Sequence, residues 1–241
     1  MSYTILPIII LNARPAAGKS EIIDYLRRVP LLQRQERFHI GEIDVIDDFP
    51  MLWAWFEEDA ILNRMGYPRL HTDEEGYFVS RHLWHVLIER ISLEYAKRRR
   101  DRVNYHTHTT AILEFSRGTE HGGYSEAYQH LTTDILRQAA TFYIQVSFEE
   151  SLRKNQARRN PDRPDSILEH SLDDAKMYRL YREDDWETFS ANDPAYLHIK
   201  GIKIPYVVFE NEDDVTTPRG APLGERLEKD LERLWRLKQA G

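Results

Sequence analysis

The chain contains no cysteine among its 241 residues. This absence excludes disulfides, zinc–thiolate sites and cysteine nucleophiles, and it favours a cytoplasmic location. The sequence also has no apolar run approaching the roughly 20 residues that are needed to span a bilayer. The short run from Ile5 to Leu11 lacks a basic leader and leads into Gly18-Lys19-Ser20 instead of a small-residue cleavage site. We therefore expect a buried strand there, with neither a signal peptide nor a membrane anchor.

Basic residues are outnumbered, because 33 Lys and Arg face 40 Asp and Glu and give a formal net charge of −7. A nucleic-acid partner is therefore not expected, and an anionic ligand has to be met by a local positive pocket. Hydrophobic residues make up 41% and charged residues 30%, which is typical of a globular protein. The length suits one large α/β domain over residues 1–241, with room for a lid-like insertion.

Short apolar runs alternate with longer amphipathic ones. The predicted strands are Thr4–Asn12, Phe38–Ile46, Thr109–Phe115, Thr141–Phe148 and Ile204–Phe209. The predicted helices are Ser20–Arg28, Pro50–Met65, Phe78–Arg99, Ser125–Gln138, Glu149–Asn160, Ser166–Tyr181 and Gly224–Lys238. This alternation predicts a doubly wound α/β sheet with right-handed crossovers.

The most specific motif lies between the first strand and the first helix. It reads Ala13-Arg14-Pro15-Ala16-Ala17-Gly18-Lys19-Ser20. In this strand–turn–helix context, Arg14 to Ser20 are assigned to phosphate binding, because backbone N–H groups of the turn and of the helix N-terminus can point at one anion. Lys19 can reach the β- and γ-phosphates, and the Ser20 hydroxyl can ligate Mg²⁺. Ala13 stands where the motif G-x-x-x-x-G-K-[S/T] has glycine, and its Cβ is expected to crowd the phosphate approach. The alternative is an ordinary helix start after a buried strand.

With this motif the chain resembles the nucleotide- and small-molecule-kinase branch of the P-loop NTPase fold. The resemblance implies a three-layer fold with a five-stranded parallel sheet in the order 2-3-1-4-5. It further implies a helical acceptor-binding region over residues 50–100 and a lid-like insertion over residues 149–195. The cofactors implied are ATP, or another nucleoside triphosphate, and Mg²⁺.

Three acids lie at the end of the second predicted strand, namely Asp44, Asp47 and Asp48. Ligands collect at the carboxyl ends of strands in open α/β sheets, so one of these acids is a candidate to accept the proton of an attacking hydroxyl. The resemblance implies the same role, and we select Asp47 as the catalytic residue. The alternative is that these acids cap the next helix.

Two further charged residues close the third strand. Glu114 ends a buried apolar run, where an acid is costly without a partner, and is a candidate Mg²⁺ ligand. Arg117 follows three residues later, and the resemblance implies that it grips the acceptor. The alternative is a surface turn with an ordinary Glu–Arg pair.

Arginines are concentrated after the fourth strand, as in the lid of the kinases that the chain resembles. Those implied to meet phosphate include Arg158, assigned to cofactor binding, and Arg159, assigned to catalysis. The alternative is a solvated helix face. Asn211, after the fifth strand, is a candidate contact to the nucleotide base, although a plain turn also explains it.

The function expected from these features is transfer of the ATP γ-phosphate to a small-molecule or nucleotide acceptor. The alternative is a nucleotide-dependent switch that hydrolyses or only binds a nucleoside triphosphate. The base-reading motif N-K-x-D of GTPases does not occur in the sequence. A homo-oligomer remains possible, and the acceptor is not identified.

Overall fold

The computed structural model describes residues 5–158 and 171–241. Its sheet has six strands in the order β2-β3-β1-β4-β6-β5. Their bounds are β1 Ile8–Ala13, β2 Glu42–Asp47, β3 Thr109–Phe115, β4 Ala139–Gln145, β5 Tyr196–Ile199 and β6 Ile202–Glu210. All neighbouring pairs are parallel except β5–β6.

The prediction of a five-stranded, all-parallel sheet was therefore wrong in its strand count. The extra strand β5 forms an antiparallel hairpin with β6 and occupies one edge of the sheet. The turn between these strands is made by Lys200 and Gly201, which both have positive φ angles, 52° and 74°. Such a two-residue turn favours a tight antiparallel hairpin. The five mutually parallel strands run β2-β3-β1-β4-β6, so β6 takes the place expected for the fifth strand.

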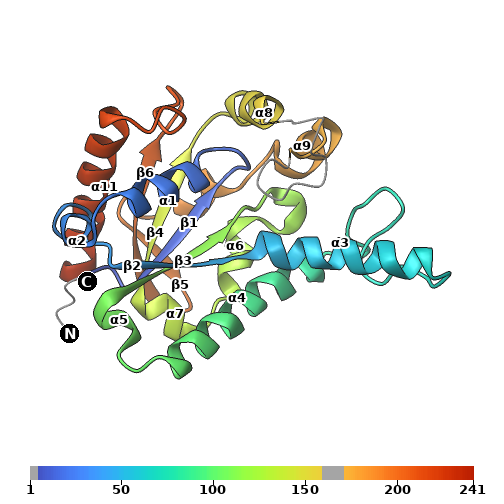
Figure 1. Ribbon diagram of the computed structural model, residues 1–241, viewed down its shortest axis with the longest axis horizontal. Coiled ribbons are helices and arrows are strands. Elements are labelled where there is room, and N and C mark those ends of the chain that lie inside the picture. The colour runs from blue at the N-terminus through green and yellow to red at the C-terminus, as the bar shows by residue number, and fades with distance from the viewer. Residues whose placement is uncertain (1–4, 159–170) are drawn as a thin grey trace.

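Helices flank the sheet on both faces (Figure 1). Their bounds are α1 Lys19–Arg28, α2 Leu31–Phe38, α3 Asp48–Arg64, α4 His82–Asp101, α5 Tyr105–His108, α6 Gly123–Gln129, α7 Thr133–Gln138, α8 Phe148–Ala157, α9 Asp174–Tyr181, α10 Trp186–Ser190 and α11 Ala221–Ala240, with a 3₁₀ turn η1 at Thr119–His121. The predicted helix Ser125–Gln138 is in fact two helices, α6 and α7, separated by a turn that keeps Leu131 fully buried. Helices α2, α5 and α10 were not predicted.

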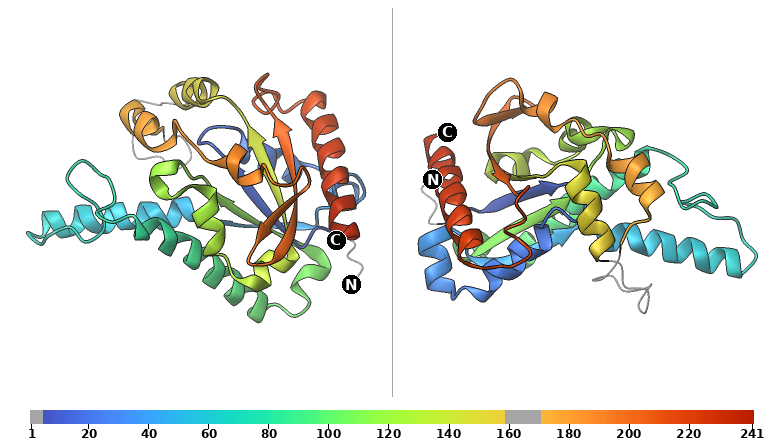
Figure 2. Two further views of the ribbon diagram at one scale, coloured as in Figure 1. Left: turned by 180° about the vertical axis from the view of Figure 1, so that it is seen from behind. Right: turned by 90° about the horizontal axis from the view of Figure 1, so that it is seen from above.

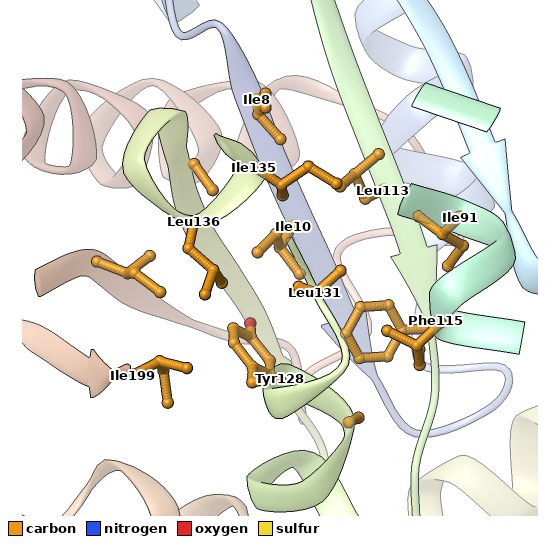
Figure 3. Packing of buried hydrophobic residues seen from close by; sticks show 14 of the residues in the cluster. Ile8, Ile10, Ile91, Leu113, Phe115, Tyr128, Leu131, Ile135, Leu136 and Ile199 are labelled. Carbon is orange, nitrogen blue, oxygen red and sulfur yellow. The ribbon is translucent and has the colours of Figure 1, made fainter. Parts of the chain in front are cut away.

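The alternation of side chains along β1 produces the layers. Ile8 and Ile10 belong to one apolar core, with residues of α4, α6 and α7 (Figure 3). Ile9 and Leu11 belong to the other core, with residues of α1, α2 and α11. A central strand that is buried on both faces has to be apolar throughout, which explains the uninterrupted run in the sequence.

Residues 50–100 contain α3 and α4, and the far end of α3 projects away from the sheet (Figures 1 and 2). The loop after α3 is fastened by Asp59, a fully buried residue whose carboxylate accepts hydrogen bonds from the main-chain N–H groups of Leu70, His71 and Thr72. The expected role of this region in acceptor binding stays a prediction.

Residues 149–195 contain most of α8 and all of α9 and α10. Helix α8 begins after Ser147, whose hydroxyl accepts a hydrogen bond from Glu150 N. The predicted helix Ser166–Tyr181 lies partly outside the described residues, and its described part is helical from Asp174. Within residues 5–158 and 171–241, none of the helices combines the length and apolar character that a membrane span requires.

Candidate functional site

The loop between β1 and α1 depends on glycine at position 18. Gly18 has φ +117°, in the left-handed region that favours glycine. A Cβ at this position would lie 2.6 Å from Thr216 Oγ1 and 2.8 Å from Thr216 Cγ2. The Thr216 side chain is itself fully buried, so it has little room to move. Both the backbone angle and the close approach therefore require Gly18.

Ala13 does not crowd the loop as its Cβ was expected to do. It still belongs to β1, pairs with Ile144 of β4, and is fully buried in the core beneath α1 and α11. The positive φ angles of the loop fall instead at Ala16, with φ 56°, and at Gly18. Ala13 is therefore accommodated within the strand, before the residues of positive φ in the loop.

The start of α1 offers backbone donors. The first hydrogen bond of this helix runs from Ile22 N to Gly18 O, so the N–H groups of Lys19, Ser20 and Glu21 precede the helical ladder. No side chain caps this end of the helix. Ser20 is exposed at its first turn. This arrangement suits an anion at the helix N-terminus.

Asn211, expected to contact a base, is instead fully buried beneath the loop. Its amide nitrogen donates to Ala17 O at 2.8 Å and to Thr216 Oγ1 at 2.9 Å. A side chain in this position supports the loop and has no exposed surface for a base. The base-contact prediction is therefore wrong for this conformation, because the residue turns inward from the end of β6.

Arg14 also points away from the loop. Its guanidinium lies 2.9 Å from Asp184 and donates to Val146 O and Tyr181 O at 3.1 and 3.3 Å. The side chains of Arg14 and Asp184 are only 14% and 7% exposed, so the pair is largely desolvated. Arg14 thus fastens the loop to the segment after α9, and only its main chain can serve an anion at the loop.

Helix α8 contacts the same loop and the first turn of α1. Ser151 Oγ donates to Pro15 O at 2.7 Å, and Arg158 pairs with Glu21. Arg158 thereby reaches the start of α1, next to the residues expected to hold phosphate. Arg159, expected to act in catalysis, lies outside the described residues.

Lys19 meets two groups from the end of β3. Its ammonium lies 2.8 Å from Ser116 Oγ and 3.9 Å from Glu114 Oε1. The side chains of Lys19 and Glu114 are 10% and 12% exposed. Burial raises the pKa of Glu114, while Lys19 acts in the opposite direction. Lys19 and Glu114 therefore lie close together, at the carboxyl ends of β1 and β3.

Asp47 lies beside Glu114, since these residues are register partners in the β2–β3 pair. Burial, together with the charges of Glu114 and Asp48, raises the pKa of Asp47 from 3.8 to about 8. Asp47 Oδ1 also accepts a hydrogen bond from Phe49 N at 2.9 Å and so caps α3. The capping alternative is thus correct, and the same carboxyl also faces the cluster around Lys19.

The other two acids of the predicted group, Asp44 in β2 and Asp48 at the start of α3, are occupied elsewhere. Asp44 accepts hydrogen bonds from Arg98, from Arg102 at 3.1 Å and from the Tyr105 hydroxyl at 2.7 Å. Asp48 is paired with Arg117 at 2.7 Å. These contacts leave Asp47 as the acid of the three that is available for chemistry beside Lys19.

Arg117, expected to grip an acceptor, is only 3% exposed. Its guanidinium binds Asp48, donates to Ser116 O and Trp84 O, and lies over the ring of Trp84. All its contacts are internal, so the acceptor-gripping prediction is wrong for this conformation. Arg117 instead holds the end of β3 against the start of α3.

Thr216 and Lys154 were not predicted as residues of this site. Thr216, Asn211 and Lys154 form a buried polar cluster behind the loop, with Lys154 Nζ 2.9 Å from Thr216 Oγ1. Lys154 also pairs with Asp214 at 2.5 Å. The sequence signal was slight, consisting of a lysine inside an otherwise charged helix and a polar stretch after β6.

Among the described residues, no three His, Asp or Glu side chains are grouped to hold a metal ion by themselves. Proteins usually hold Mg²⁺ through one or two carboxylates while substrate phosphates and water complete its shell. Of the predicted ligands, Ser20 lies in the first turn of α1 and Glu114 lies near the end of β3, 3.9 Å from the Lys19 ammonium.

Comparisons with known proteins do not assign a family. No family model matches the chain, and no curated protein sequence matches it. Among solved structures, TT1252 from Thermus thermophilus is 14% identical over 96% of both chains, with a TM-score of 0.47. APE1195 is 17% identical over 100% of this chain and 98% of the other, with a TM-score of 0.42. At these values neither likeness supports an argument about function.

Proposed function

We propose that this chain is a P-loop phosphotransferase that moves the γ-phosphate of ATP, or of another nucleoside triphosphate, to a small-molecule or nucleotide acceptor. The observation that carries the proposal is that Lys19, Glu114 and Asp47 meet at the carboxyl ends of three neighbouring strands. The uncapped helix N-terminus next to them supports the proposal, because backbone N–H groups there suit a triphosphate beside a carboxyl that would serve the acceptor.

The chemistry follows from these side chains. The Lys19 ammonium and the N–H groups at the start of α1 neutralise the β- and γ-phosphates and hold the donor in place. Ser20 and Glu114 would hold Mg²⁺, which when bound supplies further charge neutralisation on the triphosphate. Asp47, with its pKa raised to about 8, is a stronger base than an ordinary carboxylate, and in its deprotonated form it can accept the proton of an acceptor hydroxyl.

Nucleotide binding is the first test. We expect ATP with Mg²⁺ to raise the unfolding midpoint of the wild-type protein, because a ligand that binds only the native state stabilises it. Lys19→Ala should abolish most of this shift, whereas Lys97→Ala, which alters a half-exposed lysine of α4, should not. The proposal fails if no nucleoside triphosphate produces a shift, or if Lys19→Ala binds as tightly as the wild type.

Turnover then separates transfer from hydrolysis. A phosphotransferase consumes ATP at a rate that depends on a second molecule, so the screen adds candidate acceptors one at a time. A nucleotide-dependent switch would bind tightly with turnover indifferent to any acceptor. In the active case, Lys19→Ala should lower turnover by at least about 100-fold, as expected for loss of a preorganised charge at the reacting group.

A further inference from the structure

A cavity lies at the opposite end of the sheet from the β1–α1 loop. It has a volume of about 350 Å³ and lies between the end of α7, the β5–β6 hairpin and the last turns of α11. In Figure 2 (left) this hairpin turns back beside the C-terminal end of α11. Lys19 and Asp47 instead follow the carboxyl ends of their strands, so the two places are separated by the length of the sheet.

The lining of this cavity is basic. Arg137, Lys203 and Lys238 are among the lining residues, and none of the lining residues is acidic. Even if a terminal carboxylate on Gly241 is counted, the lining keeps a net charge of +2. This balance is notable in a chain whose formal net charge is −7.

Lys238 is incompletely satisfied at this place. Its ammonium donates to Arg137 O at 2.8 Å and to Ala139 O at 3.1 Å. Both acceptors are neutral carbonyls, so these hydrogen bonds do not neutralise the charge of the ammonium. A lysine ammonium has three N–H donors, and these two bonds use two of them. Burial lowers the pKa of Lys238 to about 8. An anion beside this half-buried ammonium would stabilise its charged form through a charge-assisted hydrogen bond.

The apolar part of the lining limits what the ligand can be. Tyr196, Ile202 and Leu237 form apolar wall, and Tyr196 is fixed by a hydrogen bond from its hydroxyl to Leu237 O at 3.3 Å. The volume is at the lower end of the range of small-molecule sites, about 300 to 1,000 Å³. Three cations suit a doubly charged group better than a single carboxylate, and a phosphate monoester carries about −1.5 to −2 at neutral pH.

We propose that this cavity binds a small phosphate monoester, with the phosphate among Arg137, Lys203 and Lys238 and the organic part against Tyr196 and Leu237. The site is independent of the β1–α1 loop and of the function proposed for it. The same cations would also attract free inorganic phosphate, which lacks the organic part and gains nothing from the apolar wall.

The test uses phenyl phosphate and inorganic phosphate as probes, added to full-length Lys19→Ala protein so that the β1–α1 loop does not compete. Amide resonances of residues 196–203 and 237–241 are followed by NMR at constant ionic strength. We expect saturable shifts, tighter binding of phenyl phosphate than of phosphate, and about tenfold weaker binding on loss of each exposed cation, in Arg137→Ala and in Lys203→Ala.

Lys229→Ala is the matched control, because Lys229 is an exposed lysine on α11, the helix that carries Lys238, and lies outside the cavity. It should leave the affinity unchanged. Phenyl phosphate should also raise the pKa of Lys238 from about 8, read from its side-chain resonances. The proposal is overturned if no saturable shift occurs up to ~10 mM probe, if Lys229→Ala weakens binding as much as Lys203→Ala, or if inorganic phosphate binds as tightly as phenyl phosphate.

Discussion

Replacing Asp47 by asparagine should stabilise the protein against unfolding while abolishing the proposed phosphoryl transfer. The carboxyl of Asp47 is crowded by Glu114 and Asp48, and its pKa is raised from 3.8 to about 8. Asparagine keeps the side-chain oxygen that accepts the hydrogen bond from Phe49 N, so the cap of α3 survives. The substitution therefore removes the charge and little else.

The sign of the effect follows from proton linkage. With its pKa raised on folding, Asp47 binds more protons in the native state than in the unfolded state over the interval from 3.8 to about 8. Its contribution to stability is therefore fully present below the unfolded pKa and is lost as the pH rises toward the folded pKa. Asparagine does not titrate, so the advantage of Asp47→Asn should grow with pH across this interval and level off above it.

The magnitude can be bounded. Each pH unit in this interval changes the free energy of unfolding by at most about 1.4 kcal/mol for one proton, which gives an upper limit of about 4 kcal/mol between roughly pH 5 and pH 8. Asp47 is partly accessible to solvent, which screens its charge, so we expect about 1–3 kcal/mol.

Urea unfolding of both proteins at several pH values, in EDTA to exclude divalent cations, measures this difference directly. Titrating groups far from position 47 cancel because they are common to both proteins, whereas Glu114 and Asp48 respond to the lost charge and contribute to the same pH-dependent difference. A difference that stays constant within about 0.5 kcal/mol from roughly pH 5 to pH 8 would refute the assigned crowding of Asp47, as would a difference that falls with pH. Loss of phosphoryl transfer in the same variant, without loss of nucleotide binding, is expected if Asp47 serves the acceptor.

Three further substitutions test the supports of the site. Gly18→Ala should destabilise the protein by about 2–3 kcal/mol in denaturant unfolding, because it adds backbone strain and a clash with Thr216. The control Gly66→Ala, at φ +82° with open space around it, should cost only the backbone strain, about 1 kcal/mol. Asp184→Asn should lower the free energy of unfolding by about 3 kcal/mol, because it breaks the buried ion pair with Arg14. The control Glu183→Gln changes an exposed neighbour and should lower it by under about 0.5 kcal/mol. Arg117→Lys should lower the thermal midpoint by several degrees and weaken MgATP binding little, because the lost contacts are internal.

Local features of the sequence predicted the elements that carry the site. The run Thr109–Phe115 was predicted with the bounds that β3 has, and the motif ending in Ser20 lies between a strand and a helix as expected. These predictions succeed because a strand buried on both faces and a glycine-containing turn depend on residues that are close in sequence.

The partners of each charged residue could not be predicted in this way. Asp44, Asp47 and Asp48 are equivalent as sequence, and what distinguishes them is Arg98 on α4 and Arg117 after β3. Sequence patterns do not reveal which distant cation neutralises which acid. The same limit explains the misassigned roles of Arg117 itself, whose pairing with Asp48 buries the group expected to meet a ligand.

The supports behind the loop come from still farther along the chain. Asn211 and Thr216 lie almost 200 positions after Gly18, in a stretch that reads as an ordinary polar turn. The hairpin strand β5 was missed because only four residues form it. Its signal, Gly201 between two short apolar runs, becomes specific only when the sheet edge it covers is known.

The two borders of the sheet determine how this protein can associate with copies of itself. At one border β5 is four residues long, and at the other β2 carries Glu42, Asp44 and Asp47. Short strands and charged side chains discourage strand addition from another chain, and with it fibrillar aggregation. The projecting end of α3 and its loop bear exposed Met65, Leu70 and Val79. We therefore expect any self-association to use exposed apolar surface such as this helical arm, and not the strand edges.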